Sequence, residues 1–127
     1  MQEGVIVLAH GSRYPKANQE IFQITEQVKI IGGITSVETC FLQFGQPTLP
    51  QVVEEMNRTG IKAVTVVPLL LAVGSHIQED LPELLKEQKK RYPHMTFRLA
   101  PHLGADRRIA EIVIDRMKQG SEIKHEF

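Results

Sequence analysis

Residues 5–13 read VIVLAHGSR, and this stretch decides the fold. Its five apolar residues form a run of strand length that is rich in β-branched side chains. A strand that is apolar on both faces is typical of a parallel sheet covered by helices on both sides. The run ends at His10, where polar and glycine residues begin. The same pattern returns at residues 64–76, VTVVPLLLAVGSH, which end at His76.

Strand-like and helix-like segments alternate through the whole chain of 127 residues. Short apolar runs predict strands at about residues 4–9, 36–42, 63–69 and 96–100. Apolar spacing and terminal residues predict helices at about residues 15–31, 48–58, 80–91 and 105–119. The pattern indicates one α/β domain over residues 1–120, followed by a flexible polar tail at residues 121–127.

Local signals mark where three of the helices begin and which way the first one faces. Pro15 suits the first turn of a helix, and Thr48 with Gln51 forms a capping-box pattern. Pro82 is placed in the first turn of the third helix, which we expect to begin near residues 80–81. The first helix is expected to bury a stripe of apolar residues consisting of Ile21, Ile24, Val28 and Ile31.

The alternation of strands and helices predicts a three-layer α/β fold. Right-handed crossovers place the strands in one parallel sheet with helices on both of its faces. Four strands amount to half of a doubly wound domain, and the expected strand order is 2-1-3-4. The switch point then lies between the first and third strands, which lead into His10 and His76. The sequence therefore predicts that both imidazoles reach one crevice, where ligands bind in such sheets.

Candidate chemical groups follow the strand ends, which meet at one edge of a parallel sheet. The residues at the four strand ends are His10, Gln43, His76 and His102. The remaining histidines fall elsewhere, His94 at the opposite edge and His125 in the tail. A neutral imidazole binds Co²⁺, Ni²⁺, Zn²⁺ or Fe²⁺ well and accepts a proton near neutral pH. Two imidazoles at one edge can therefore hold a transition metal or move protons near neutral pH.

Composition excludes several classes of partner. Fifteen basic and fifteen acidic residues give a formal net charge of zero, which argues against nucleic acid or an anionic membrane. No apolar stretch reaches the roughly 20 residues that span a bilayer. The first three residues lack the basic region of a signal peptide, and the one cysteine, Cys40, reads as a small buried apolar residue. We expect a cytoplasmic protein.

Seven blocks of the sequence together resemble the class II chelatases. These blocks are HGSR at 10–13, FLQ at 41–43, PTL at 47–49, VPLLL at 67–71, GSH at 74–76, DLP at 80–82 and PHLGAD at 101–106. They cover nearly the whole chain in the order found in the family. The length is similar to that of the short, single-repeat sirohydrochlorin cobaltochelatases of the CbiX type, whereas longer relatives carry two such repeats.

The resemblance implies insertion of a divalent metal into a tetrapyrrole, without ATP or an organic cofactor. The expected reaction places Co²⁺ in sirohydrochlorin, with Ni²⁺ or Fe²⁺ as other metals, and the metal-site and catalytic residues implied are His10 and His76. The family's third functional position, commonly a glutamate, is Gln43 here. A neutral amide is a poor proton acceptor and a poor metal ligand. Either the histidines act alone, or activity is reduced, or the chain is a non-catalytic metal or tetrapyrrole carrier.

The implied substrate is a large polyanion, and this directs attention to further polar residues. The expected substrate-binding set is Ser12, Arg13, Gln43, Ser75 and His102. Lys16, Arg107 and Arg108 are additional candidates to meet carboxylates, each of which can also be an ordinary solvated charge. The resemblance further implies a twofold homodimer with the tetrapyrrole between subunits. A third class, a phosphoryl-transfer enzyme that uses His10, would need more arginines near His10 than Arg13 alone.

Overall fold

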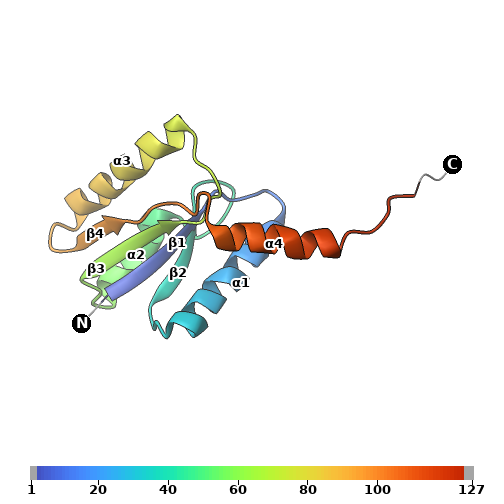
Figure 1. Cartoon of the computed structure of the whole chain (residues 1–127). Coiled ribbons are helices and arrows are strands. Elements are labelled where there is room, and N and C mark those ends of the chain that lie inside the picture. Colours follow the sequence, from blue (N-terminus) through green and yellow to red (C-terminus); the bar gives the residue numbers. More distant parts are fainter. Residues whose placement is uncertain (1–2, 125–127) are drawn as a thin grey trace.

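The computed structural model describes residues 3–124, which form one parallel sheet and four helices in alternation (Figure 1). The strands are β1 (Glu3–Ala9), β2 (Val37–Phe41), β3 (Ala63–Pro68) and β4 (Thr96–Leu99). Their order in the sheet is β2-β1-β3-β4, with every neighbouring pair parallel. This confirms the predicted strand order and places the switch point between β1 and β3.

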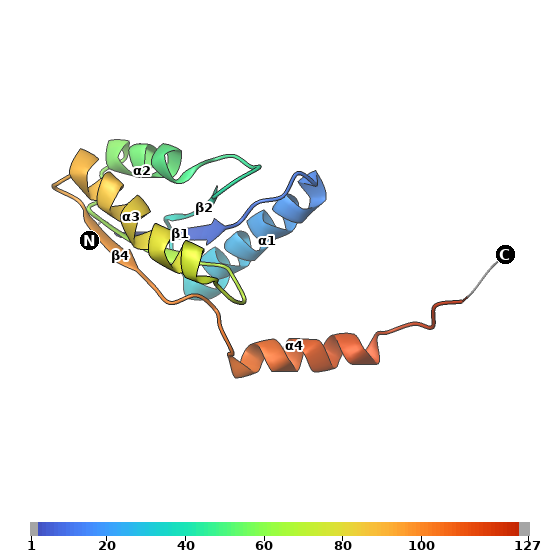
Figure 2. The same cartoon turned by 90° about the horizontal axis from the view of Figure 1, so that it is seen from above.

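The helices lie on both faces of the sheet (Figure 2). They are α1 (Pro15–Gly32), α2 (Leu49–Arg58), α3 (Ser75–Arg91) and α4 (Arg107–Lys118). α2 and α3 cover one face, and α1 covers part of the other. The predicted capping box is present at α2, where the Thr48 amide donates to Gln51 Oε1 over 2.8 Å and the Gln51 amide donates to Thr48 Oγ1 over 3.4 Å. The three-layer α/β fold is confirmed.

The main apolar core lies between the sheet and the α2/α3 layer. It unites alternate residues of the two central strands with the inner faces of both helices, including Ile6, Leu8, Val53, Met56, Val64, Val66, Leu81 and Leu85. Cys40 is fully buried in this core, as expected, and burial raises the pKa of its thiol to about 12. This layer anchors β1, which leads into His10, and α3, which carries His76.

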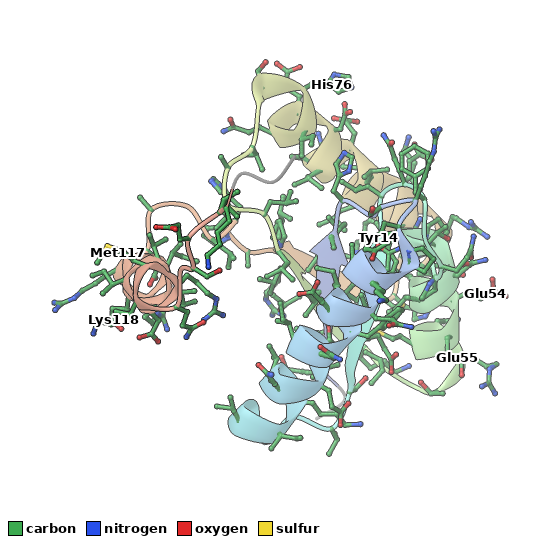
Figure 3. The ribbon with its side chains drawn as sticks, turned by 90° about the vertical axis from the view of Figure 1, so that its right-hand side faces the viewer. Tyr14, Glu54, Glu55, His76, Met117 and Lys118 are labelled. Atoms are coloured by element: carbon green, nitrogen blue, oxygen red, sulfur yellow. The ribbon has the colours of Figure 1, made fainter. Side chains whose placement is uncertain are left out.

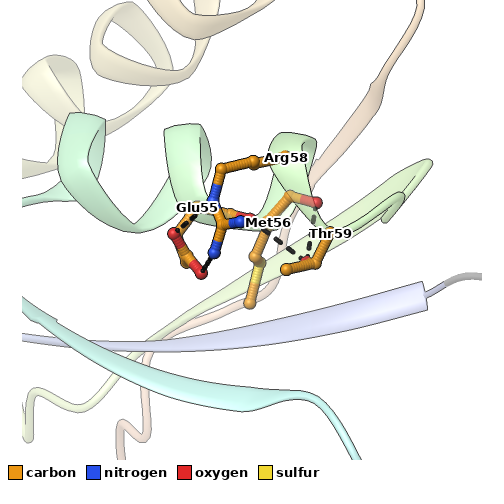
Figure 4. A network of polar contacts seen from close by, with 4 residues as sticks. All are labelled: Glu55, Met56, Arg58 and Thr59. Carbon is orange, nitrogen blue, oxygen red and sulfur yellow. Dashed lines mark hydrogen bonds and ion pairs between the residues drawn. The ribbon is translucent and has the colours of Figure 1, made fainter.

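A polar network ends α2 above the sheet (Figure 4). Arg58 forms an ion pair with Glu55 and lowers the pKa of that carboxyl below its ordinary value. The Thr59 hydroxyl donates to the carbonyl oxygens of Glu55 and Met56 over 3.1 and 3.2 Å. The Met56 side chain leaves this network towards the sheet, where it is buried. The network therefore fixes the end of α2 while its apolar face stays in the core.

The α1 layer is thinner than predicted. Thr25 is the buried residue of α1, and Thr39 on β2 donates a hydrogen bond of 2.7 Å to its hydroxyl. In contrast, Ile24 and Ile31 of the expected buried stripe are exposed, Ile31 to 85%. The prediction for this face was wrong because apolar spacing reveals a stripe but not what covers it. In the structure the stripe lies beside the face of α1 that contacts the sheet, and not on that face.

The start of α3 also differs from the prediction. The helix begins at Ser75 with Gly74 as its N-cap, not near residues 80–81, and Pro82 lies inside it. Pro82 cannot donate to the Gln78 carbonyl and its ring crowds that carbonyl, yet the helix continues through it to Arg91. His76 consequently lies in the first turn of a helix and not in a loop.

α4 contradicts the expectation that every helix covers the sheet. It is shorter than predicted, and none of its residues is buried. Figure 2 shows it leaving the domain on the side opposite α2 and α3. Among the described residues, no helix has both the length and the apolar character needed to cross a membrane. The predicted tail at residues 121–127 is described only as far as residue 124, and His125 lies outside the described residues.

Candidate functional site

A hollow of about 470 Å³ lies at the carboxyl edge of the sheet. His10 and Gln43 reach it from the ends of β1 and β2, and His76 reaches it from α3. Apolar walls come from Leu42, Ile77, Leu81 and Leu84, and further polar groups come from Asp80, Glu83 and Glu87. The structure thus brings together His10, His76 and Gln43, although the functional roles predicted for them stay predictions.

The ends of β1 and β2 are tied to each other by the backbone. The Gln43 amide donates to the His10 carbonyl over 2.9 Å, continuing the register of the two strands. Gly11 follows with φ +96°, and a Cβ at this position would lie 1.6 Å from the Gln43 carbonyl oxygen. Only glycine fits such a close approach at positive φ. His10 and Gln43 are therefore held at a fixed backbone separation.

The His10 imidazole itself is only loosely held. His10 is exposed, and its Nδ1 lies 3.4 Å from the carbonyl oxygen of Gly11. That separation is beyond the usual range of an N–H···O hydrogen bond, so the contact contributes little to the orientation of the ring. The ring can therefore turn towards a metal or a substrate proton without breaking a strong interaction.

The His76 imidazole is oriented by a carboxylate. His76 Nε2 lies 3.0 Å from Asp80 Oδ2, one helical turn further along α3, and the His76 side chain is 88% exposed. Figure 3 shows His76 at the end of α3 that projects from the domain. A carboxylate on one ring nitrogen fixes the tautomer and leaves the other nitrogen for a metal. In this geometry the nitrogen left available is Nδ1.

α3 presents a row of acidic groups to the same hollow. Asp80, Glu83 and Glu87 follow His76 by four, seven and eleven residues and line the hollow with it. Such spacing keeps residues on one face of a helix. The position of Glu83 and Glu87 beside His76 was missed from the sequence, because a helix that begins at residue 80 does not align them with His76. Their spacing from His76 was the available signal.

Other predicted residues lie outside this hollow. His102 lines a separate hollow of about 370 Å³ with Pro68, Val73 and Leu99 among its neighbours. Ser12 and Arg13 line a third, of about 410 Å³, next to α1. Ser75 is the first residue of α3 and makes no capping hydrogen bond through its side chain.

Local partners hold Ser12 and Arg13, which follow the end of β1. The Ser12 hydroxyl accepts from the Tyr14 amide over 3.0 Å, and the Arg13 guanidinium lies 4.4 Å from the centre of the Phe44 ring. This contact is a cation–π interaction that leaves the edge of the guanidinium free for an anion. His94 lies at the opposite edge, as predicted, with Nε2 2.7 Å from Asn57 Oδ1.

The two arginines at the start of α4 are not near the hollow in this chain. Arg108 bonds Asp106 over 2.8 Å, and Arg107 lies 3.6 Å from Glu111. The Arg108 guanidinium holds the pKa of the Asp106 carboxyl well below its ordinary range. These contacts stabilise the beginning of α4, where Asp106 is also the N-cap.

A metal site of three or more protein ligands is not found in the part of the chain that the structure describes. No three His, Cys, Asp or Glu side chains of residues 3–124 are grouped closely enough to hold an ion. His10 and His76 thus remain a pair of candidate ligands in one hollow, as the sequence predicted.

The chain is similar to proteins named as chelatases. It is 34% identical to the sirohydrochlorin cobaltochelatase of Methanopyrus kandleri, over 91% of this chain and 94% of that protein. It is 30% identical to the sirohydrochlorin ferrochelatase of Priestia megaterium, over 98% of this chain and 47% of that protein. The chain thus spans about half the length of the Priestia relative.

The fold is also similar to that of a sirohydrochlorin chelatase of known structure. The sirohydrochlorin chelatase SirB from Bacillus subtilis subspecies spizizenii, solved in complex with cobalt, superimposes with a TM-score of 0.87. The two are 31% identical, and the match covers 94% of this chain and 51% of SirB. The CbiX family model matches residues 4–120, which is nearly the whole of the described structure. The chain belongs to the CbiX family.

Proposed function

We propose that this chain is a lyase-type chelatase that inserts a divalent metal, Co²⁺ first of all, into sirohydrochlorin in tetrapyrrole and cobalamin biosynthesis, without ATP. One observation carries the proposal: His10 and His76 line the same hollow at the sheet's carboxyl edge. Relatives of this family are named for insertion of cobalt or iron into sirohydrochlorin. Fe²⁺ and Ni²⁺ are the other metals that imidazole ligands would accept.

The two histidines would divide the work of insertion. Asp80 orients the ring of His76, so Nδ1 of His76 presents the incoming metal to the macrocycle. Insertion of a divalent metal releases two pyrrole N–H protons, and the His10 imidazole accepts the first. Two protein ligands leave open coordination positions, which a metal that must be handed over requires.

The acidic row on α3 can supply the carboxylate that position 43 lacks, because Gln43 is a neutral amide. Asp80, Glu83 and Glu87 line the same hollow as Gln43. Each provides the anionic oxygen that an amide lacks, so one of them accepts the second pyrrole proton. In this proposal the carboxylate of the site comes from α3 and not from the end of β2, while Gln43 contributes its amide to the substrate.

Substrate carboxylates would be met around the rim. Arg13 and Ser12 lie beside α1 on one side, and Ser75 and His102 lie on the sides of α3 and β4. Arg13 is the strongest candidate because its guanidinium stacks on Phe44 and keeps its N–H groups in solvent. We expect Arg13→Ala to raise KM for sirohydrochlorin more than it lowers kcat.

The proposed working form is a cytoplasmic homodimer with the tetrapyrrole between two copies. The relative lengths support this proposal, because one copy of this chain matches about half of SirB. A flat macrocycle exceeds what one shallow hollow of about 470 Å³ can enclose. Two hollows that face each other across a twofold axis would enclose it from both sides.

The test is absorbance-monitored insertion of Co²⁺ into sirohydrochlorin, with the spontaneous rate subtracted. We expect wild-type protein to complete many turnovers, and both His10→Ala and His76→Ala to lose at least 100-fold in kcat/KM. His94→Ala is the matched control, because His94 lies at the opposite edge of the sheet. It should retain the wild-type rate.

The assay also distinguishes a chelatase from a non-catalytic carrier, the alternative suggested by the glutamine at position 43. A spectral change that saturates at one equivalent per site, at the background rate of insertion, would replace the enzyme with a carrier. The absence of both turnover and a spectral change would contradict the tetrapyrrole function itself.

A further inference from the structure

The side-chain amide of Asn18 is hydrogen-bonded through both its nitrogen and its oxygen. Asn18 lies near the start of α1 and is half-buried. Its Oδ1 accepts from the Ser12 amide over 3.0 Å. Its Nδ2 donates to the Ser12 carbonyl over 2.9 Å and to the Phe44 carbonyl over 3.0 Å. A carboxamide has two N–H donors, so both donors of Asn18 are in use.

These three bonds join two segments that follow different strands. Ser12 belongs to the segment after β1, and Phe44 belongs to the segment after β2. Asn18 and Phe44 are 26 residues apart in the chain. The amide is also closely packed, because a Cβ at Gly45 would lie 3.2 Å from Asn18 Nδ2 and 2.8 Å from ring atoms of Phe41. Asn18 therefore holds the two segments together.

The backbone of Phe44 depends on such support. Its φ is +50°, which is uncommon for a residue other than glycine. A conformation of this kind persists only where the surrounding structure holds it. The bond from Asn18 Nδ2 ends on the carbonyl oxygen of Phe44 itself. Asn18 thus contributes directly to the backbone conformation that places the Phe44 ring.

The residues beside these bonds form the cation–π pair at the rim. Arg13 follows Ser12 directly, and its guanidinium lies 4.4 Å from the centre of the Phe44 ring. Both members of the pair are exposed, and a cation–π contact at an exposed site is weak by itself. Asn18 bonds the backbone next to Arg13 and the backbone of Phe44, so it constrains the pair from both sides.

The histidine end of the site is held by other contacts. The Gln43 amide donates to the His10 carbonyl over 2.9 Å and continues the register of the sheet. His76 comes from α3, and Asn18 does not line the hollow that the two histidines share. Loss of the Asn18 amide should therefore displace Arg13 and leave His10 in place.

We propose that Asn18 is a positioning residue, which joins Ser12 to Phe44 and thereby holds Arg13 where a carboxylate of the substrate binds. Asn18 has no N–H donor left for that carboxylate, so it acts through Arg13. A guanidinium that is held in advance loses less freedom on binding an anion, so the link should appear in substrate affinity. The inference rests on the proposed function, because the anion is a carboxylate of sirohydrochlorin.

Insertion kinetics at varied sirohydrochlorin concentration test the proposal. Asn18→Ala removes all three bonds, and because alanine favours a helix, α1 should stay folded. We expect KM for sirohydrochlorin to rise about tenfold, with little change in kcat. Asn57→Ala is the matched control, because the Asn57 side chain also joins two segments, with Oδ1 2.7 Å from His94 Nε2, but at the opposite edge of the sheet. It should keep the wild-type KM. An unchanged KM in Asn18→Ala would overturn the proposal.

A double variant shows whether Asn18 acts through Arg13. Arg13→Ala alone should raise KM for sirohydrochlorin. Adding Asn18→Ala to it should raise KM no further, because the group that Asn18 positions is then absent. If the two effects on KM multiply instead, Asn18 affects the substrate by another route and the assignment is overturned.

A measurement without substrate separates this inference from the proposed function. The Ser12 amide is bonded to Asn18, so Asn18→Ala should speed its hydrogen exchange about tenfold or more, while amides within β1 keep their protection. Equal exchange of Ser12 in the two proteins would overturn the link itself. Failure of the wild type to bind or convert sirohydrochlorin would instead overturn the proposed function, and the substrate role of Asn18 with it, even where the exchange of Ser12 responds as expected.

Discussion

The two faces of the sheet differ in what covers them. On one face, α2 and α3 bury a continuous core that includes Ile6, Val53, Met56 and Val64. On the other face, α1 buries Thr25 and leaves Ile31 largely in solvent, while α4 leaves the domain altogether. The comparison teaches that one layer is closed by helices of the chain, whereas the other leaves apolar residues of α1 and α4 exposed.

This division also bears on function. The closed layer holds β1 and α3 rigidly, and these elements place His10 and His76 in one hollow. The open layer lies behind the sheet and contributes no wall of that hollow. Changes in the closed layer should therefore lower the free energy of unfolding more than changes in the open layer.

The largest effect is expected from a cavity in the closed layer. Met56→Ala removes a side chain that is 2% exposed and should lower the free energy of unfolding by about 2–5 kcal/mol. Met117→Ala on α4, where the side chain is 73% exposed, should change it by less than about 0.5 kcal/mol in dilute protein. Urea unfolding at two protein concentrations measures both. A cost for Met117→Ala that is as large, and independent of concentration, would remove the distinction between the layers.

A smaller loss of unfolding free energy is expected from glycine substitutions, and only one of them should also affect the candidate site. Gly11→Ala adds a Cβ against the Gln43 carbonyl at φ +96° and should separate the ends of β1 and β2. Gly33→Ala is the control, because its φ is +61° but no atom lies within 4 Å of the added Cβ. Strain alone costs about 1–2 kcal/mol at each position. Only Gly11→Ala should also reduce the insertion rate, by at least tenfold, and equal rates in the two variants would contradict the fixed separation of His10 and Gln43.

The polar contact between α1 and the sheet should show coupling. Thr25→Val leaves the buried Thr39 hydroxyl without its acceptor and should cost about 1–3 kcal/mol. The double variant with Thr39→Val removes both hydroxyls and should be less destabilised than Thr25→Val alone. A double-mutant cycle in urea measures the coupling. Additive costs would mean that the 2.7 Å bond does not hold α1 on the sheet.

The smallest effect concerns the buried thiol and appears only at high pH. Burial raises the pKa of Cys40 from 9.0 to about 12, so the folded protein keeps a proton that the unfolded chain loses. This contribution to stability is complete below pH 9 and is lost as the pH rises towards 12. Cys40→Ala should flatten the pH dependence of unfolding in that range. Rapid labelling of the native thiol by a thiol reagent at pH 8 would contradict its burial.

Much of this structure follows from sequence patterns. The buried strand at residues 5–9 and its repeat at residues 64–68 predict the parallel sheet, the strand order and the shared crevice of His10 and His76. Strand-end residues are positioned by the backbone, and backbone register follows from short-range patterns. The same argument explains why the capping box at Thr48 was predictable.

The remaining features depend on contacts that lie beyond any local pattern. The apolar stripe of α1 can be recognised from its spacing, but its exposure depends on the tertiary placement of α4, which leaves the domain. The acidic row of Glu83 and Glu87 was hidden because Pro82 indicated a later start for α3. The separation of His102 from the other two histidines depends on how side chains turn at the edge, which spacing along the chain does not specify.

The central claim is that His10 and His76 jointly handle the metal, and Co²⁺ binding tests it most directly. Titration with Co²⁺, followed through the visible absorption of the ion and the shifted imidazole proton resonances, should show one ion per hollow with imidazole ligands. Both signals should be lost in His10→Ala and in His76→Ala, and kept in His94→Ala. Retention of the same spectrum by a His10→Ala/His76→Ala double variant would contradict the claim.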